Sequence, residues 1–195
     1  MVQWRSSKRI RSALAPAAFI NPCLPCVANH APSAEGWIHE IKHDGFRLQI
    51  HVRDGQVALY TMTGVDWTMR YPWIVQDAAG LKVRHAILDA ECCVDGPDGM
   101  TEFAMLVDRR HDDRAYAIAF DVPAIDDKDL RPLPLLDRKA RLERLMRKAK
   151  PGIRLSEYLT GDGPTIFQHA CKLGLEGIVS KRVNAPYRSG RAKTG

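Results

Sequence analysis

The run of residues from Phe46 to Arg53 constrains the fold of this chain more than any other segment. It reads FRLQIHVR, and this strict alternation of apolar and polar residues is the period of a β-strand with one face on a core. The next two residues, Asp54 and Gly55, tolerate the positive φ angles of a two-residue hairpin turn, and a second strand-like run covers residues 56–60. The sequence therefore predicts a β-hairpin over residues 46–60.

Other segments of strand and helix character surround this hairpin. Strands are predicted over residues 37–42, 84–94, 115–122 and 176–181, and helices over residues 138–149 and 165–173. In the first of these helices we expect Asp137 to cap the amino terminus and the leucines to pack on one side, while the seven basic side chains of residues 138–150 face elsewhere. Hairpins with inserted helices favour an α+β fold of antiparallel sheets with flanking helices over a doubly wound parallel sheet.

Composition and cysteine content exclude several classes of protein. With 195 residues, of which 45% are apolar, the chain can bury a core without disulfides or metals. No stretch approaches the roughly 18 uninterrupted apolar residues of a membrane-spanning helix, so no membrane partner is expected. Five cysteines, an odd number, suit a reducing cytoplasm. Cys23 and Cys26 form a lone CxxC near His30, and without a second ligand pair a zinc or redox site is the weaker interpretation.

The net charge of +6 is concentrated at the two ends of the sequence. Residues 1–34 carry four basic and no acidic side chains, and residues 181–195 carry five basic and no acidic ones. The segment between them has 29 − 9 = 20 basic against 23 acidic side chains. Clustered Lys and Arg are typical of contact with a polyanion, although solvated tails explain the same pattern. Residues 1–35, rich in Pro, Ala and Ser, are predicted to form a tail and an entry loop.

Four short motifs place chemically useful side chains at strand ends. They are EIKHDGFR at 40–47, LDAE at 88–91, FD at 120–121 and EGIVSK at 176–181. A lysine amine that attacks phosphorus must first lose its proton, and nearby cations or a bound metal make that loss easier. Carboxylates such as Glu91 and Glu176 offer the oxygen ligands that Mg²⁺ prefers, and Phe120 offers a face for a purine ring.

Together and in this order, the motifs resemble the nucleotidyltransferase motifs of ATP-dependent DNA ligases, whose superfamily includes RNA ligases and mRNA capping enzymes. The segments WIHEIKHDGFR at 37–47, LEGIVSKR at 175–182 and PYRSGR at 186–191 are most similar to the bacterial ligases of end joining and their small stand-alone relatives. The resemblance covers about residues 19–194. It implies an ATP-grasp-like adenylation domain over residues 19–195, preceded by a basic tail at 1–18, in a cytoplasmic, nucleoid-associated enzyme that seals nicked DNA.

The resemblance also implies a role for each motif residue. Lys42 is the expected nucleophile, which forms lysyl-AMP from ATP and releases pyrophosphate. The expected ATP-binding residues are Glu40 at the adenine amino group, Lys42, Arg47 at the ribose or phosphates, Glu91 at the ribose, Phe120 stacked on adenine, and Lys181. Glu91 and Glu176 are the expected ligands of Mg²⁺ or another divalent cation. Arg182, Arg188 and Arg191 are expected to contact nicked double-stranded DNA.

The sequence departs from the ligase pattern in three places. Ala90 replaces the glycine of the usual Asp-Gly-Glu, and Met62 stands where an arginine near the nick phosphate is expected. The sequence also stops before the Trp-Leu-Lys-x-Lys motif and the OB-fold domain of relatives, which implies an adenylation domain incomplete at its C-terminus, with a missing or separate OB-fold partner. The alternative is a degenerate or truncated relative that binds nucleotide or DNA without completing ligation.

Each motif residue also has a purely structural interpretation when it is taken alone. Glu91 and Asp121 could end strands, Phe120 could belong to the core, and Lys181 could belong to a solvated basic segment. The basic helix over residues 138–150 is interpreted as a solvated face packed by its leucines, although its charge could also contact a DNA backbone.

Overall fold

The computed structural model describes residues 18–191 of the chain. The predicted basic tail therefore lies outside the described residues except for its last position, and so does Lys193. Within residues 18–191, no helix is both long enough and apolar enough to cross a lipid bilayer.

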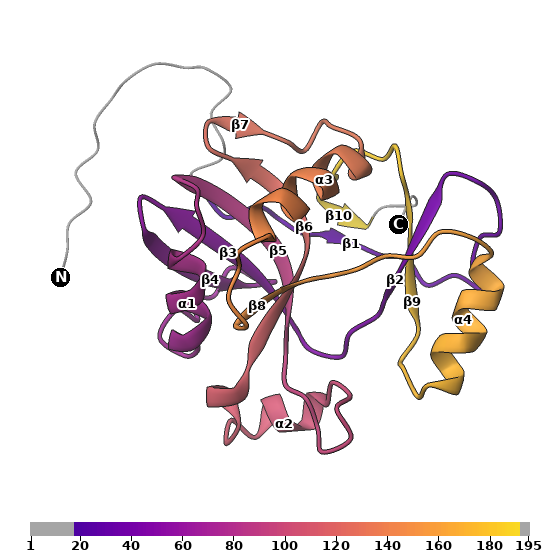
Figure 1. The fold of residues 1–195 in the computed structure, drawn as a ribbon, viewed down its shortest axis with the longest axis horizontal. Coiled ribbons are helices and arrows are strands. Elements are labelled where there is room, and N and C mark those ends of the chain that lie inside the picture. The colour runs from indigo at the N-terminus through magenta and orange to yellow at the C-terminus, as the bar shows by residue number, and fades with distance from the viewer. Residues whose placement is uncertain (1–17, 192–195) are drawn as a thin grey trace.

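A mainly antiparallel sheet forms the body of the molecule (Figure 1). Its strands are β3 (Phe46–Arg53), β4 (Gln56–Thr61), β5 (His85–Cys93), β6 (Tyr116–Ile125), β7 (Lys128–Asp129) and β8 (Ile153–Leu155). They lie in the order β4-β3-β5-β6-β7, and β8 pairs with β6 in parallel. The predicted hairpin is confirmed, because β3 pairs with β4 across Asp54 and Gly55, whose φ angles are 48° and 78°.

One face of this sheet packs against helices to form the core. The helices are α1 (Pro72–Ala79), α2 (Phe103–Val107) and α3 (Leu135–Met146), and a short 3₁₀ helix covers Asp112–Arg114. Leu48 and Ile50 of β3 and Leu88 of β5 are fully buried in one cluster with Ile74 of α1 and Leu142 of α3. Because side chains alternate along a strand, the neighbouring polar residues of β3 and β5 point to the opposite face, away from these helices.

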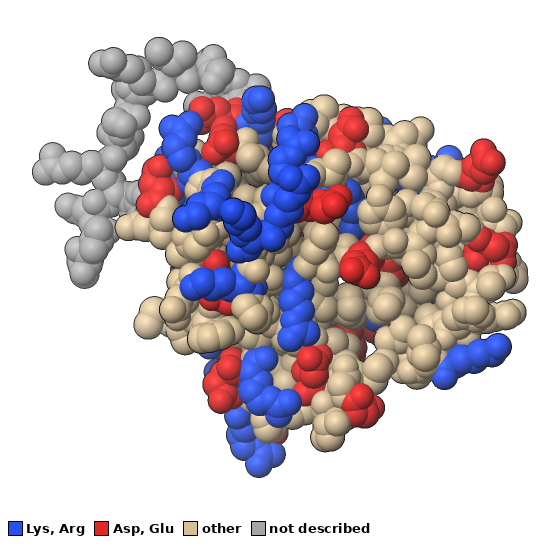
Figure 2. All heavy atoms as spheres, viewed as in Figure 1, with Lys and Arg blue, Asp and Glu red and all other residues tan. Residues whose placement is uncertain are grey.

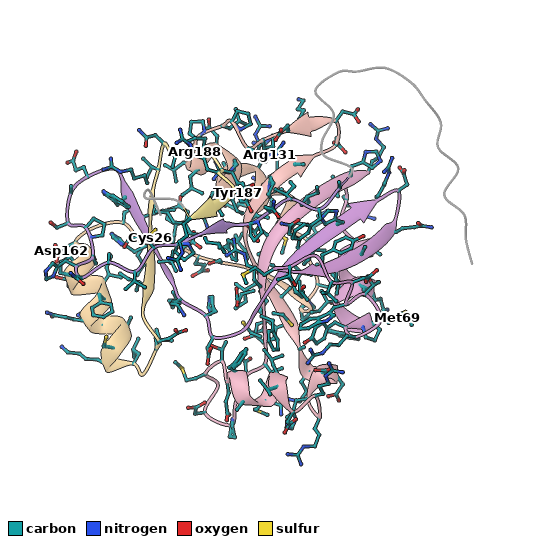
Figure 3. All side chains as sticks on the ribbon, turned by 180° about the vertical axis from the view of Figure 1, so that it is seen from behind. Cys26, Met69, Arg131, Asp162, Tyr187 and Arg188 are labelled. Carbon is teal, nitrogen blue, oxygen red and sulfur yellow. The ribbon has the colours of Figure 1, made fainter. Side chains whose placement is uncertain are left out.

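A second, smaller group of elements stands beside the sheet on the side away from α1 (Figure 1). Strand β2 (Trp37–Ile41) pairs antiparallel with β9 (Ile178–Arg182), and α4 (Gly163–Lys172) packs against this pair. The short strands β1 (Cys23–Leu24) and β10 (Gly190–Arg191) pair in parallel. From behind, Tyr187 lies near Arg131 (Figure 3), whose backbone oxygen accepts a hydrogen bond from the Tyr187 N–H at 2.8 Å.

Two local predictions were wrong in their details. Residues 20–24 are not only an entry loop, because Ile20 is buried and β1 pairs with a strand more than 160 residues later. Strand β6 runs past Val122 to Ile125, and Pro123, which has no N–H to donate, falls where the pairing with β5 shifts register. Both are consequences of long-range pairing that a local pattern does not reveal.

The helix predicted over residues 138–149 begins and ends earlier than expected. In the structure α3 spans Leu135–Met146 with Pro134 at the N-cap position, so Asp137 lies in the first turn and is not the cap. Arg138 and Lys139, which we expected to face away from the packed side, are 3% and 4% exposed. They share the buried side of α3 with Leu135, Leu142 and Met146.

Candidate active site

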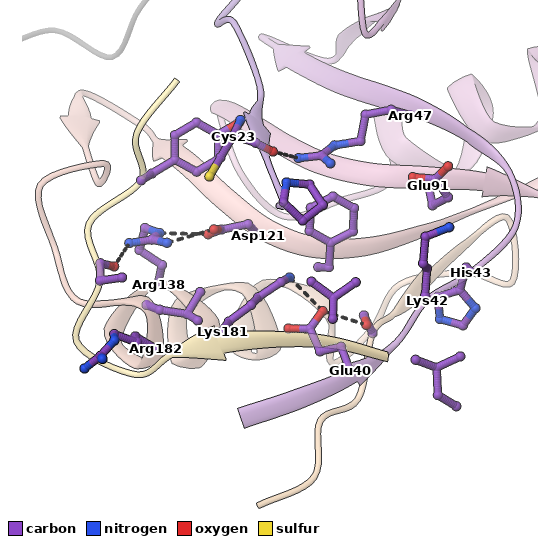
Figure 4. A pocket seen from close by; sticks show the side chains of 18 of the residues that line it. Cys23, Glu40, Lys42, His43, Arg47, Glu91, Asp121, Arg138, Lys181 and Arg182 are labelled. Carbon is purple, nitrogen blue, oxygen red and sulfur yellow. Dashed lines mark hydrogen bonds and ion pairs between the residues drawn. The ribbon is translucent and has the colours of Figure 1, made fainter. Parts of the chain in front are cut away.

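A cavity of about 240 Å³ opens between the main sheet and the β2–β9 pair (Figure 4). All six residues expected to bind ATP line it: Glu40, Lys42, Arg47, Glu91, Phe120 and Lys181. They come from strands β3, β5, β6 and β9 and from the end of β2, so the fold gathers residues that are 141 positions apart in the sequence.

Lys42 lies immediately after β2, in the loop that enters β3. Its backbone N–H donates to the Gly177 carbonyl oxygen at 2.9 Å, and its ammonium group forms an ion pair with the Glu176 carboxylate. The two side chains are 46% and 43% exposed, so Lys42 stands at the mouth of the cavity that it lines. Glu176 does not line the cavity itself and contacts the site through the Lys42 amine. Gly45 allows the loop to pass close to β5, because a Cβ atom at this position would collide with the Cys92 carbonyl oxygen and lie 3.0 Å from Glu91 Cγ.

Glu40 is buried in the wall of the cavity and is surrounded by donors. Lys181 Nζ lies 2.9 Å from Glu40 Oε2, Lys139 Nζ lies 2.5 Å from Oε1, and the Ser156 hydroxyl donates to Oε2 at 3.1 Å. Burial lowers the pKa of Lys139, while the Glu40 charge opposes that shift. Two lysines from different elements thus share one buried carboxylate.

Arg47 is fixed against the sheet by Asp89. Its guanidinium donates to both carboxylate oxygens of Asp89, at 2.6 and 2.7 Å, and to the Cys23 carbonyl oxygen at 3.0 Å. Burial by itself would lower the pKa of Arg47, but the charge of Asp89 and its hydrogen bonds raise the pKa on balance. The Tyr187 hydroxyl also donates to Asp89, at 2.7 Å. Arg47 Cζ lies 4.4 Å from the centre of the Phe120 ring, so a rigid cation stands beside this aromatic face.

Glu91 stands opposite Arg47 in the pairing of β3 with β5. Burial raises the pKa of Glu91 to about 7, and the positive charges of Arg47 and Lys42 limit the increase. A carboxyl group with this pKa is partly protonated near neutral pH, and a bound cation would favour its ionised form. Perturbed carboxyl groups of this kind cluster at functional sites.

Arg138 and Asp121 close the far side of the cavity (Figure 4). The guanidinium makes two hydrogen bonds of 2.8 Å to the carboxylate and donates to the carbonyl oxygens of Leu133 and Ala185. Arg138 thereby ties α3, β6 and the segment after β9 together.

The sequence interpretation missed Arg138 and Lys139 as parts of the site. A signal for them existed, because positions 135, 138, 139, 142 and 146 follow the helical spacing of one buried stripe. His43 was also missed; it lines the cavity beside Lys42, and burial lowers its pKa.

Comparison with known proteins decides the family. The family model of the ATP dependent DNA ligase domain matches residues 25–195. The chain belongs to the ATP-dependent DNA ligase family. This confirms the resemblance found in the four motifs.

Several of the matched relatives are end-joining proteins. The multifunctional non-homologous end joining protein LigD of Pseudomonas aeruginosa is 37% identical over 178 residues, which cover 89% of this chain and 21% of that protein. The LigD DNA repair protein of Mycobacterium tuberculosis is 33% identical over 171 residues, covering 86% of this chain and 22% of that protein. The ligase-family chain therefore spans about a fifth of the length of these relatives.

Solved structures of the family agree with the fold. A mycobacterial DNA ligase D complexed with ATP and MES matches with a TM-score of 0.78 and 32% identity, over 87% of this chain and 56% of that one. The ligase domain of M. tuberculosis LigD matches with a TM-score of 0.78 and 30% identity, over 89% of this chain and 57% of that one. The predicted α+β class with antiparallel sheets is confirmed as that of a ligase adenylation domain.

The residues expected to contact DNA in this ligase-family chain are less closely grouped than those of the cavity. Arg182 lines the cavity, with its guanidinium 4.8 Å from the centre of the Trp37 ring. Arg188 and Arg191 are exposed and do not line the cavity. In the sequence they come just after Tyr187, which lines the cavity.

Two of the departures from the ligase pattern have clear positions in the structure. Ala90 is fully buried between Leu48 and Ala119 in the sheet, so its Cβ contributes to the core. Met62 is 47% exposed in the turn after β4 and does not line the cavity. The first departure is accommodated by packing, and the second leaves the cavity unchanged.

Proposed function

We propose that this ligase-family chain forms lysyl-AMP on Lys42 and passes the AMP to a nicked DNA end. The single observation that supports this proposal best is the position of the Lys42 amine. It stands at the mouth of a cavity whose walls carry four further cations, Arg47, Arg138, Lys181 and Arg182. A cavity of this charge suits a triphosphate, and positioning with charge neutralisation is most of what phosphoryl chemistry needs.

In the proposed reaction, the neutral amine of Lys42 attacks the α-phosphorus of ATP. The N–P bond forms as the P–O bond to pyrophosphate breaks, and the amine gives up a proton. Glu176, which contacts the amine, is placed to accept that proton. A DNA 5′-phosphate oxygen then attacks the lysyl-AMP phosphorus and releases Lys42, and the 3′-hydroxyl displaces AMP to join the strand.

The nucleotide would be held by residues of the cavity wall. We assign Phe120 to stacking on the adenine ring and Glu40 to the adenine amino group. Arg47 and Lys181, which flank the Phe120 ring at 4.4 and 4.5 Å, would contact the ribose and phosphates. Because Arg47 is already fixed by Asp89, it loses little freedom on binding.

The carboxylates beside Lys42 fit a magnesium ion held largely by the nucleotide. Glu176 contacts the Lys42 amine, and Glu91 lies close enough to feel its charge. Mg²⁺ at nucleotide sites takes one or two carboxylates together with phosphate oxygens and water. Among residues 18–191 no cluster of three or more His, Cys, Asp or Glu is spaced to hold a metal, so the protein would supply Glu91 and Glu176 only. Bound Mg²⁺ would neutralise phosphate charge at this position.

Nicked double-stranded DNA is the proposed partner, contacted by Arg182, Arg188 and Arg191. The LigD relatives are described as end-joining repair proteins, which supports a role in repair. They are also several times longer than this chain, so we propose that sealing requires an OB-fold domain in addition to residues 19–195. Because these relatives are bacterial, the DNA would be met in the cytoplasm.

Incubation with α-labelled ATP and Mg²⁺ tests the proposal. The chain should acquire a covalent label that acid releases, and Lys42→Ala should acquire none. As a matched control, Lys148→Ala removes an exposed lysine and should label like the wild type. No label on the wild type above the Lys42→Ala background would contradict autonomous adenylation, and sealing of nicked DNA would exclude a non-catalytic binder.

A further inference from the structure

The buried carboxylate of Glu40 has more positive charge around it than it needs. It is 3% exposed and lies within ion-pair distance of two lysines, Lys139 from α3 and Lys181 from β9. A single cation is enough to balance one carboxylate. The second lysine therefore needs an explanation that the roles proposed above do not supply.

The two lysines are held very differently. The Lys139 side chain is 4% exposed, and its ammonium also donates to the Ser156 carbonyl oxygen at 3.3 Å, in a helix packed against the core. The Lys181 side chain is 18% exposed, and Glu40 is the one carboxylate with which it forms a hydrogen bond in the described structure. Lys139 is thus a fixed partner of Glu40, whereas Lys181 can turn towards the cavity on its four-carbon stem.

Lys181 also occupies space beside the aromatic ring on which a base would stack. Its Nζ lies 4.5 Å from the centre of the Phe120 ring, and Arg47 Cζ lies 4.4 Å from the same point. Arg47 cannot leave without breaking its two hydrogen bonds to buried Asp89. Of the two cations that compete with a base for the ring, Lys181 is therefore the one that can move.

Departure of Lys181 would be costly if Glu40 had no other partner. A buried carboxylate left without a cation loses the interaction that compensates its desolvation. Lys139 removes this obstacle, because it keeps Glu40 paired while Lys181 is elsewhere. Glu40 is then paired with a cation both before and after a triphosphate enters the cavity.

We propose that Lys139 is a positioning residue: it holds Glu40 in place and so frees Lys181 to leave Glu40 for the phosphates of the bound nucleotide. This proposal rests on the nucleotide binding proposed above, but not on the covalent step. Without Lys139, Lys181 would be retained by Glu40 and the cavity would lose a phosphate contact. Loss of Lys139 would therefore weaken ATP binding, because the Glu40 carboxylate would keep Lys181 away from the phosphates.

A double-mutant cycle measured by calorimetry tests this coupling. All variants carry Lys42→Ala, so that MgATP binds without reacting. Lys139→Met keeps the length of the side chain and removes its charge, and we expect it to raise the Kd for MgATP about tenfold, equivalent to about 1.4 kcal/mol. In a Glu40→Gln background, where Lys181 is not retained, Lys139→Met should change the Kd less than about twofold. Lys148→Met, an exposed charge removal just after α3, should leave the Kd unchanged.

A second readout separates positioning from a general loss of folding. With Lys42 present, Lys139→Met should raise the ATP concentration for half-maximal adenylation about tenfold and change the rate at saturating ATP by less than about threefold. Lys139→Arg should recover most of the affinity, because it restores a cation. The inference would be overturned if Lys139→Met raised the Kd for MgATP equally with Glu40 and with Gln at position 40. It would also be overturned if Lys139→Met lowered the adenylation rate at saturating ATP and left the half-maximal ATP concentration unchanged. Intact MgATP binding without any covalent label would instead contradict only the proposed chemistry.

Discussion

At the scale of single residues, Glu91 shows how the cavity controls a charge. Burial raises the pKa of its carboxyl group to about 7 from a model-peptide value of about 4.5. Between about pH 4.5 and about pH 7, the Glu91 carboxyl group is therefore ionised in the unfolded chain and protonated in the folded chain. The free energy of unfolding therefore falls as the pH rises from about 4.5 to about 7, and the full cost is present above pH 7.

Glu91→Gln should consequently make the protein more stable and less active. The variant mimics the protonated carboxyl group, so we expect its gain in unfolding free energy to grow from near zero at pH 4.5 to at most about 3 kcal/mol at pH 8. Urea denaturation at several pH values measures this gain. The exposed Glu143→Gln should give a difference that does not change with pH. A gain for Glu91→Gln that is larger at pH 5 than at pH 8 would contradict the assigned cause.

At the scale of elements, helix α3 is fixed in place by its buried charges as well as by its leucines. Arg138 joins the helix to Asp121 of β6 and to the Ala185 carbonyl oxygen, and Lys139 joins it to Glu40 of β2. One helix face therefore positions two separate strands around the cavity. The opposite face of α3 carries exposed basic side chains, which form part of the band of Lys and Arg seen in Figure 2.

Loss of the Arg138 guanidinium should destabilise the fold strongly. Arg138→Met leaves the Asp121 carboxylate, 5% exposed, without its cation, and breaking a buried pair in this way costs about 3–5 kcal/mol. Arg144→Met, on the exposed face of the same helix, should change the unfolding free energy by no more than about 0.5 kcal/mol. Adding Asp121→Asn to Arg138→Met should recover part of the loss. Equal urea midpoints for the two single variants would show that the buried pair does not secure α3.

At the scale of the whole molecule, two basic surfaces are candidates for the proposed contact with DNA. Arg182 lines the cavity, and Arg188 and Arg191 follow the cavity-lining Tyr187 in the sequence. The exposed face of α3, by contrast, lies opposite the stripe that packs towards the core and the cavity. Phosphate contacts can be counted from the salt dependence of the binding affinity, because each contact releases counterions from the duplex.

We expect the Arg188→Ala/Arg191→Ala variant to weaken binding to nicked duplex and to flatten its salt dependence. The slope of log K against log salt should decrease in magnitude by about 0.9 for each lost phosphate contact, measured by fluorescence anisotropy between about 50 and 200 mM salt. The Arg141→Ala/Arg144→Ala variant removes the same charge from α3 and should leave the slope unchanged. The reverse result would place the DNA on the α3 face.

Much of the architecture was accessible from local patterns. The alternation over Phe46–Arg53 and the Asp54-Gly55 turn predicted the β3–β4 hairpin, because strand period and turn preference depend on neighbouring residues alone. The pairings of β1 with β10 and of β6 with β8 were not predicted, since β1, β8 and β10 are only two or three residues long and leave no distinctive pattern. All six residues that the four motifs predicted to bind ATP line the cavity.

The sequence by itself determined which residue types stand at the site and that the chain belongs with the ligases. Only the tertiary structure decided where the charges of α3 point. Among the seven basic residues at positions 135–150, Arg138 and Lys139 turn inward because distant strands bring Asp121 and Glu40 to them. A lysine or arginine is stable in the interior only beside a compensating carboxylate, and the position of that carboxylate is a property of the folded chain.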